Sequence, residues 1–215
     1  MTLEEIYPIK NLEAKFEKAI QFDTYYMDDI ERISKLEPGC LFELGASAWM
    51  HHVESHPDVD PQQLATYFEK KDPYIFRKVE EISGHSIIQE IILIRAHVKD
   101  NKLNRDICGQ LLISRVHPKN IHISDVEFSN PYIPIPQKEK KYLYHEYKSL
   151  GLFRELLGNI ITYGKKYNIE KITLSAASRH QISYFEGHGF NVENTEFAKQ
   201  AIKMDSGIPM ERSCT

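Results

Sequence analysis

The chain has 215 residues, of which 41% are hydrophobic and 27% charged, and its formal net charge is −4 at pH 7. These values are typical of a folded globular protein and argue against a nucleic-acid partner, which usually requires a net basic surface. Three scattered cysteines without a CxxC pair argue against a disulfide framework and favour a reducing, cytoplasmic location. The N-terminus does not resemble a signal peptide, and the apolar runs are too short to span a membrane. We therefore expect no membrane partner.

Residues 1–80 are expected to be mainly helical, after one short strand at Leu3–Lys10. Apolar residues at helical spacing, interrupted by breakers such as Glu37-Pro38-Gly39, predict four helices in this part. They cover Asn11–Phe22, Tyr25–Leu36, Leu41–His52 and a segment from Asp60 to about Asp72.

Residues 86–215 are expected to form a sheet and its helices, so the whole chain is interpreted as one mixed α/β domain over 1–215. The predicted strands are Ser86–Val98, Ile107–Val116, Ile121–Phe128 and Lys171–Ala176, with a loop at Asn130–Pro136 and two weak strands near the C-terminus. The predicted helices are Leu150–Tyr167 and Arg179–His188, the second closed by Gly189. Period-two spacing in the third strand places Ile121, Ile123, Asp125 and Glu127 on one face.

A loop with one glycine leads directly into the longest helix, over Lys148–Leu157. The first N–H groups of a helix have no partner within the helix and lie at the positive end of its dipole. Such a helix start can bind a diphosphate, although a single glycine before a helix is more often a simple turn.

The loop resembles the pyrophosphate loop of the GNAT superfamily, Gln/Arg-x-x-Gly-x-Gly/Ala, with Lys148, Gly151 and Phe153 at its three positions. The strand Lys171–Ala176 and the segment ending in Gly189-Phe190 resemble the strand and helix that come after that loop in the family. The resemblance implies a GNAT-like, mostly antiparallel central sheet flanked by helices, with an enlarged helical N-terminal region. It also implies an N-acyltransferase that uses acetyl-CoA or another acyl-CoA as co-substrate.

The resemblance also implies site residues. The backbone of the loop would bind the cofactor, with Lys148 and Arg154 near its phosphates and Ser178 near its pantetheine amide. The complete set of implied cofactor-binding residues is Lys148, Ser149, Leu150, Gly151, Leu152, Phe153, Arg154 and Ser178. Two of them have simpler interpretations, because Arg154 can be a surface residue and Ser178 a helix N-cap.

Amide formation from a thioester requires a base for the amine proton and is helped by an acid for the leaving thiolate. In the resembled family the base is commonly a carboxylate on the strand before the central helix, which suggests Glu127 first and Asp125 second. Tyr184 is the candidate acid. The same residues are also compatible with a solvent-facing acidic pair and a packed helix aromatic. The acceptor would be a primary amine of a small molecule or a protein.

Departures from the family pattern keep other hypotheses open. Phe153 replaces a small residue, and Phe185 stands where the family usually has its acidic tyrosine. A non-catalytic GNAT-like binding module, with the N-terminal helices as a partner or homodimer interface, is one alternative. Val126–Asn130 resembles the Glu-x-Ser-Arg segment of autoinducer and long-chain N-acyl amino acid synthases, which gives a second.

A metal site is not expected. His52 and His56 stand four residues apart on a predicted helix, as metal ligands often do, and His51 precedes them. However, no HExxH order and no further ligand accompany them.

Overall fold

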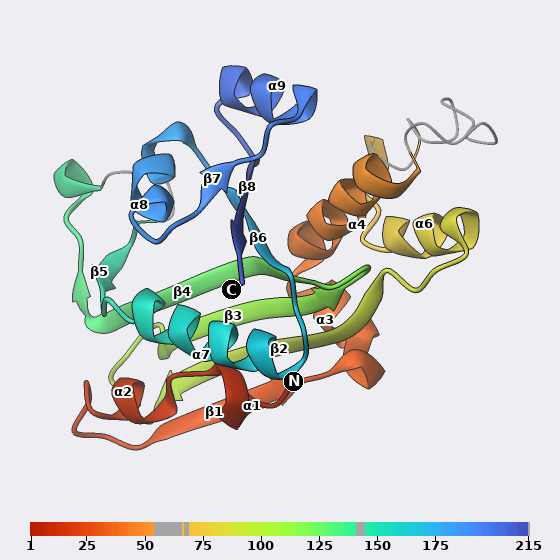
Figure 1. Cartoon of the computed structure of the whole chain (residues 1–215). Coiled ribbons are helices and arrows are strands. Elements are labelled where there is room, and N and C mark those ends of the chain that lie inside the picture. The colour runs from red at the N-terminus through yellow and green to blue at the C-terminus, as the bar shows by residue number, and fades with distance from the viewer. Residues whose placement is uncertain (54–65, 67–68, 141–144, 215) are drawn as a thin grey trace.

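The computed structural model describes residues 1–53, 66, 69–140 and 145–214, and is built around one mixed sheet. The strands follow the order β1-β2-β3-β4-β6-β8-β7, and β5 pairs with β4 outside this path (Figure 1). All pairs are antiparallel except β4 with β6. The predicted fold class, a mostly antiparallel mixed sheet flanked by helices, is confirmed. The strands are β1 Ile20–Tyr25, β2 Ile88–Val98, β3 Ile107–Val116, β4 Asn120–Pro134, β5 Tyr147–Ser149, β6 Lys171–Ala176, β7 Asn191–Val192 and β8 Ile208–Ser213.

Helices cover both faces of this sheet, with α7 across one face and α4 and α6 against the other (Figure 1). The α-helices are α1 Leu3–Ile6, α2 Ile9–Glu13, α3 Ile30–Leu36, α4 Pro38–His52, α6 Ile75–Ser83, α7 Phe153–Lys166, α8 Ile182–Glu186 and α9 Glu196–Met204. Short 3-10 helices occur at η1 Met27–Asp29, η2 Gln137–Glu139 and η3 Arg179–Gln181.

The face under α7 is closed by apolar packing. Leu156 and Ile160 of α7 are fully buried in the same cluster as Ile92 and Ile94 of β2. Burying each such side chain stabilises the fold by about 1.5–3 kcal/mol. The stripe of apolar residues that predicts this helix is therefore the stripe that holds it on the sheet.

The opposite face is covered by α4 and α6, which approach each other closely at Gly45. A Cβ atom at Gly45 would lie 2.8 Å from the backbone nitrogen of Phe76, so only glycine fits there. Leu44 and Trp49 of α4 are buried in a second apolar cluster with Leu93 of β2. We call the two sides of the sheet the α7 face and the α4 face.

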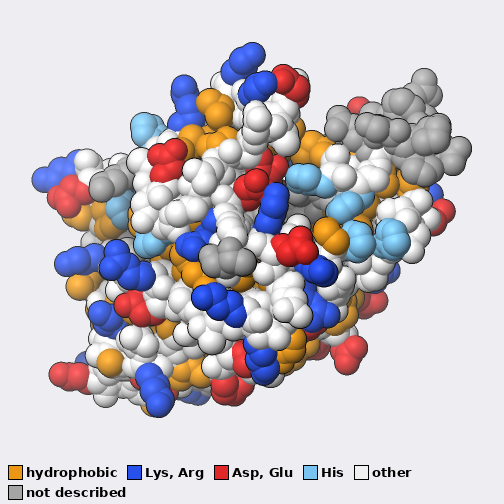
Figure 2. All heavy atoms as spheres, in the orientation of Figure 1, with side chains coloured by type: hydrophobic (Ala, Val, Ile, Leu, Met, Phe, Trp, Pro, Cys, Tyr) orange, Lys and Arg blue, Asp and Glu red, His pale blue; other side chains and the backbone are white. Residues whose placement is uncertain are grey.

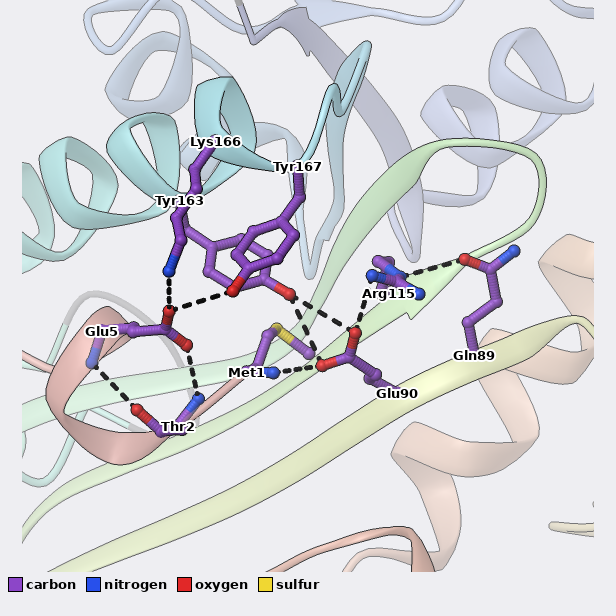
Figure 3. A network of polar contacts seen from close by, with 9 residues as sticks. All are labelled: Met1, Thr2, Glu5, Gln89, Glu90, Arg115, Tyr163, Lys166 and Tyr167. Carbon is purple, nitrogen blue, oxygen red and sulfur yellow. Dashed lines mark hydrogen bonds and ion pairs between the residues drawn. The ribbon is translucent and has the colours of Figure 1, made fainter.

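The C-terminal end of α7 is fixed by a polar network (Figure 3). Glu5 of α1 accepts a hydrogen bond from Lys166 at 2.9 Å. Glu90 of β2 forms a 2.7 Å ion pair with Arg115 of β3 and accepts from the Tyr163 hydroxyl at 3.4 Å. Burial, followed by the nearby Glu90, raises the pKa of Tyr163 to about 12, so this tyrosine remains a donor. The helix therefore has fixed contacts with the N-terminal segment and with two strands.

The first 25 residues differ from the prediction. Leu3–Lys10 is not a strand but contains α1 and the start of α2. The predicted helix Asn11–Phe22 is also wrong, because α2 ends at Glu13 and β1 begins at Ile20. Pairing with β2, from Ile20 opposite Val98 to Tyr25 opposite Leu93, outweighs the helical spacing in the sequence.

Elsewhere the predicted elements are mostly confirmed. Leu41–His52 lies within α4, and the predicted helix Tyr25–Leu36 is η1 followed by α3. Most of the helix predicted from Asp60 lies outside the described residues. Asn130–Pro136 is predicted as a loop, but its residues up to Pro134 belong to β4, which continues there and pairs with β5. Helices α6 and α9 were not predicted.

A β-bulge in β4 decides which side chains face α4. Ile123 pairs with Ile113, but the next pair joins Asp125 to Leu112, so Ser124 is an extra residue on β4. Ile123 is buried on the α7 face, whereas Leu112 belongs to the apolar cluster under α4. The predicted common face for Ile121, Ile123, Asp125 and Glu127 is therefore wrong, because the bulge turns the last two toward α4.

Candidate functional site

The neighbouring strands β4 and β6 separate after four paired residues. Their parallel ladder runs from Asn120 opposite Lys171 to Ile123 opposite Leu174, and β4 then continues without β6. A cavity of about 420 Å³ lies at the far end of β4, and we call it the splay cavity. Its lining residues are Val126, Glu127, Phe128, Ser129, His145, Tyr147, Ser149, Leu152, Phe153, His180, Gln181, Tyr184 and Phe185.

The start of α7 forms one wall of the splay cavity. Gly151 has φ of +70°, a left-handed conformation that favours glycine, and it turns the chain into the helix. The helix begins at Phe153, and its N-cap residue, Leu152, makes no side-chain capping hydrogen bond among the described residues. The first amides of the helix, at the positive end of the helix dipole, can therefore bind an anion.

Two of the predicted backbone donors already have partners inside the chain. The Leu150 N–H donates to the Phe128 carbonyl at 2.9 Å, and the Gly151 N–H donates to Ser149 Oγ at 3.2 Å. The Leu150 contact holds the loop on the end of β4, and the Ser149 contact shapes the turn. The amides of Leu152 onward are the better candidates for a bound ligand.

Positive charge surrounds the start of α7. Arg154 is exposed on its first turn. Burial lowers the pKa of His188, and the nearby charges of Arg154 and Arg212 lower it further. The two arginines thus lie close to the same ring, near the helix start. Lys148 is exposed on β5 and does not line the splay cavity, and its role stays a prediction.

Glu127 lines the splay cavity and is fixed by two hydrogen bonds. Arg105, from the loop between β2 and β3, donates to one carboxylate oxygen at 2.7 Å. The Ser129 hydroxyl donates to the other oxygen at 2.7 Å. Arg105 also contacts Glu146 at 3.6 Å and lies over the ring of Tyr147. Each carboxylate oxygen of Glu127 keeps a second lone pair for an incoming donor.

Asp125, the second candidate base, lies on the same face of β4 but does not line the splay cavity. It accepts a 2.6 Å hydrogen bond from Gln110, which also donates to Glu37 at 3.0 Å. Glu37 forms an ion pair with Arg95 at 2.6 Å. Burial raises the pKa of Asp125, the Gln110 hydrogen bond opposes this, and nearby Glu37 raises it again. Asp125 therefore belongs to a partly buried network beside the cavity.

Tyr184 of α8 lines the same cavity as Glu127, as the sequence interpretation requires. Its side chain is 51% exposed and packs on the rings of Phe153 and His188. Phe185, at the family's tyrosine position, is buried against Phe153. The structure thus brings Glu127, Tyr184 and the start of α7 to one cavity.

Ser178 lies apart from this group. It precedes η3 in an extended conformation, its side chain makes no capping hydrogen bond, and it does not line the splay cavity. The N-cap hydrogen bond is thus not formed, and the cofactor contact of Ser178 stays a prediction.

A second cavity, of about 260 Å³, lies between α4 and the α4 face of the sheet. We call it the α4 cavity. Figure 2 shows histidine side chains beside acidic and basic ones on the surface near α4. Its lining residues are Leu44, Ser47, Ala48, His51, His52, Ile87, Val116, His117, Pro118, Asn120, His122, Lys171, Thr173, Leu174, Ser175, Glu193, Pro209 and Glu211. The sequence alone did not predict this cavity.

Two ion pairs line the α4 cavity. His51 Nε2 lies 3.2 Å from a carboxylate oxygen of Glu193, and Lys171 Nζ lies 2.7 Å from one of Glu211. The hydrogen bond to Glu193 raises the pKa of His51, while burial partly opposes it. The side chain of Glu193 is 9% exposed, whereas that of His51 is 42% exposed. The carboxylate is thus the fixed member of this pair.

His122 of β4 is the most buried ionisable side chain of the α4 cavity. The residue is 6% exposed, and its Nδ1 lies 2.9 Å from Thr173 Oγ1. Burial lowers the pKa of His122 to about 4, so its ring is neutral at pH 7. A neutral ring can accept a hydrogen bond or donate one, depending on its tautomer.

The histidines near α4 do not form a metal centre in the described residues. The rings of His85 and His117 stack at 4.7 Å, and His52 contacts His117 edge-on at 5.4 Å. No group of three or more possible metal ligands is found within the described ranges, and His56 lies outside them. The described residues also contain no helix that is long and apolar enough to cross a membrane.

No model of a protein family matches this chain, and neither does any curated protein. Solved structures do match, and they are acetyltransferases. One is a GNAT acetyltransferase from Staphylococcus aureus Mu50, with 16% identity and a TM-score of 0.38 over 92% of this chain and all of that chain. Another is the Tetrahymena GCN5 histone acetyltransferase in complex with coenzyme A, with 16% identity and a TM-score of 0.37 over 93% and 96% of the two chains.

Nourseothricin acetyltransferase also matches, with 15% identity and a TM-score of 0.37 over 58% of this chain and 66% of its own, just under two thirds. The matching structures belong to the family that the loop and helix motif resembles. At such low identities and TM-scores they give this chain neither a substrate nor an activity.

Proposed function

We propose that this chain is an N-acyltransferase that moves an acetyl or other acyl group from acyl-CoA to a primary amine. The observation that carries the proposal is the splay cavity, because three kinds of group that acyl transfer needs meet there. They are the uncapped helix start at Phe153, the carboxylate of Glu127 and the hydroxyl of Tyr184.

The residues around the start of α7 fit a diphosphate. Open space surrounds Gly151, so a ligand can approach its backbone closely. The amides from Leu152 onward and the charge of Arg154 would hold the phosphates. The apolar wall of Phe128, Leu152 and Phe153 would cover the pantetheine arm. When bound, an acyl-CoA supplies the thioester whose acyl group is transferred.

Glu127 would remove a proton from the acceptor ammonium, so that the neutral amine can attack the thioester carbonyl. The new C–N bond forms as the C–S bond breaks, and the thiolate leaves. Tyr184 would give the thiolate its proton, and the acylated nitrogen would lose its second proton to the resulting tyrosinate, directly or through water. Glu127 would then release the first proton to solvent. Arg105 and Ser129 would keep Glu127 oriented throughout, because they bind one carboxylate oxygen each.

Isothermal titration with acetyl-CoA and with CoA tests the cofactor site. We expect saturable binding of both, and weaker binding of dephospho-CoA if basic side chains hold the 3′-phosphate. No binding at millimolar acetyl-CoA would contradict the proposal. Release of free thiol with a panel of primary amines then measures turnover.

The turnover assay also separates the alternatives. Binding of acetyl-CoA without thiol release from any amine or donor would favour the non-catalytic module. Transfer from long-chain acyl-CoA or acyl carrier protein, but not from acetyl-CoA, would favour the autoinducer-type or acyl amino acid synthase. The Ser129 to Glu127 hydrogen bond lies within the segment that suggested this second alternative.

A further inference from the structure

The α4 cavity and the splay cavity are both lined by residues of β4. His122 and Glu127 both project from β4 toward α4, because the bulge at Ser124 corrects their spacing. Three residues of β4 lie between His122 of one lining and Val126 of the other, and the four residue steps span at most about 13 Å. An elongated ligand can therefore place one end at each cavity.

The charges of the α4 cavity favour a cation. Its lining contains the carboxylates of Glu193 and Glu211 against the single ammonium of Lys171. Together with His51 these groups sum to −1 when the ring is neutral and to zero when it is protonated, which its hydrogen bond to Glu193 favours, so a ligand ammonium would take the place of the His51 charge. Within the described part of the chain, the Glu193 carboxylate is paired only with the exposed His51, whereas Lys171 is held by Glu211. A ligand ammonium can thus replace His51 at Glu193 without breaking the second ion pair.

The polar atoms beyond the ion pairs also suit a small amine. The Thr173 hydroxyl donates to the Ile121 carbonyl and so accepts from His122 Nδ1, which leaves Nε2 of this buried, cavity-lining ring as an acceptor for a bound ammonium. A volume of about 260 Å³ is below the range of drug-sized ligand pockets and suits the end of an aliphatic chain. Leu44, Ala48 and Pro209 supply apolar contacts for its methylene groups.

We propose that the acyl acceptor is a small, elongated amine with a second cationic group, and that the α4 cavity binds this second group beside Glu193. The inference rests on the proposed acyl transfer at the splay cavity. The reacting amine would lie at Glu127 while Glu193 holds the far end. Glu193 is therefore a specificity-determining residue and takes no part in the bond changes.

The test compares two acceptors that differ in one group, 1,8-diaminooctane and 8-amino-1-octanol, with acetyl-CoA as donor and thiol release as the readout. We expect kcat/KM for the diamine to exceed that for the amino alcohol by roughly tenfold or more, since one charge-assisted hydrogen bond is gained. Nonproductive binding of the amino alcohol does not change this ratio, because it affects kcat and KM equally. The substitution Glu193→Gln should bring the ratio down to about two through a higher KM for the diamine, because two equivalent amines remain.

A matched control is Glu196→Gln, which makes the same change at an exposed position of α9 and should keep the wild-type ratio. If Glu193→Gln folds poorly, His51→Gln serves as a second variant, and it should lower the KM for the diamine by removing the competitor at Glu193. A wild-type ratio near two would overturn this inference, and so would no turnover of the diamine by protein that binds acetyl-CoA. Failure to bind acetyl-CoA would instead contradict the proposed function.

Discussion

The two faces of β4 carry different side chains. On the α7 face, the strands present Ile92, Ile94 and Ile123, all within the apolar cluster that includes the core of α7. On the α4 face, β4 presents His122, Asp125 and Glu127. The same strand thus contributes apolar residues to one side and ionisable residues to the other.

This difference separates stability from chemistry along one strand. Apolar burial on the α7 face offsets the conformational entropy that folding costs. The ionisable residues on the α4 face lose hydration and need partners, and they stabilise the fold less than apolar residues of similar size would. We therefore expect substitutions of the apolar residues under α7 to affect folding first, and substitutions of the ionisable residues on the α4 side of β4 to affect ligands first.

The largest expected effect is on the α7 face. Ile160→Ala removes a fully buried side chain from the centre of α7 and should lower the free energy of unfolding by about 4 kcal/mol. Urea denaturation measures this loss. Ile133→Ala, at a side chain that is 44% exposed, is the control and should change it by less than about 0.5 kcal/mol. Equal losses would contradict the assignment of the core.

His122 is expected to make stability depend on pH. Its pKa is about 4 in the folded chain and about 6.5 when unfolded, so only the unfolded chain gains a proton between these values. The free energy of unfolding should therefore fall as the pH falls from about 6.5 to about 4, by up to roughly 3 kcal/mol. His122→Asn keeps a partner for Thr173 and should flatten this part of the curve. An unchanged slope in the variant would refute the buried, neutral histidine.

Glu127→Gln should separate turnover from acetyl-CoA binding. Loss of a general base lowers kcat by roughly 100-fold, or about 2.7 kcal/mol in the barrier, while acetyl-CoA affinity stays similar. Steady-state thiol release and titration measure the two quantities. Glu170→Gln, at an exposed ion pair with Lys119, is the matched control and should retain wild-type kcat. Wild-type kcat in Glu127→Gln would remove Glu127 from the mechanism.

The smallest expected effects are on the free energy of unfolding, at two glycines near the start of α7, and they have opposite signs. Gly151→Ala should lower the free energy of unfolding by about 1 kcal/mol, because φ of +70° disfavours a side chain even in open space. Gly158→Ala, inside the exposed part of α7, should stabilise by about 0.5–1 kcal/mol because alanine favours the helix. Thermal denaturation of both variants measures this. The same sign for both would contradict the turn at Gly151.

Much of the fold could be predicted from the sequence where pattern and environment agree. Ile107–Val116 and Lys171–Ala176 are strands with the predicted bounds, since both are apolar runs with clear ends. Strand β1 could not be predicted, because its pairing with β2 is a tertiary contact. Helix α9 did carry a signal, since Thr195 caps its first turn by accepting from the Ala198 N–H.

The splay cavity was predicted in part and the α4 cavity was not. Glu127, Tyr184 and the start of α7 follow from the loop motif and strand order. The α4 cavity depends on the bulge at Ser124 and on how α4 lies on the sheet. Neither has a local sequence signature, so His51 and Glu193, separated by 142 positions, show no relation in the sequence.

The short parallel ladder between β4 and β6 also has a consequence for folding. Strands β1 to β4 form an antiparallel meander, while β6 to β8 form a second antiparallel group. Only the ladder of Asn120–Ile123 with Lys171–Leu174 joins these groups by strand pairing within the described residues, and it connects segments about 50 positions apart. Such distant pairing forms late, since its loop-closure entropy must be overcome first. The α4 cavity is lined by both strands of this ladder, and the splay cavity is lined by β4 together with α8, which follows β6. A chain that folds each half but fails to join them would therefore have neither binding site.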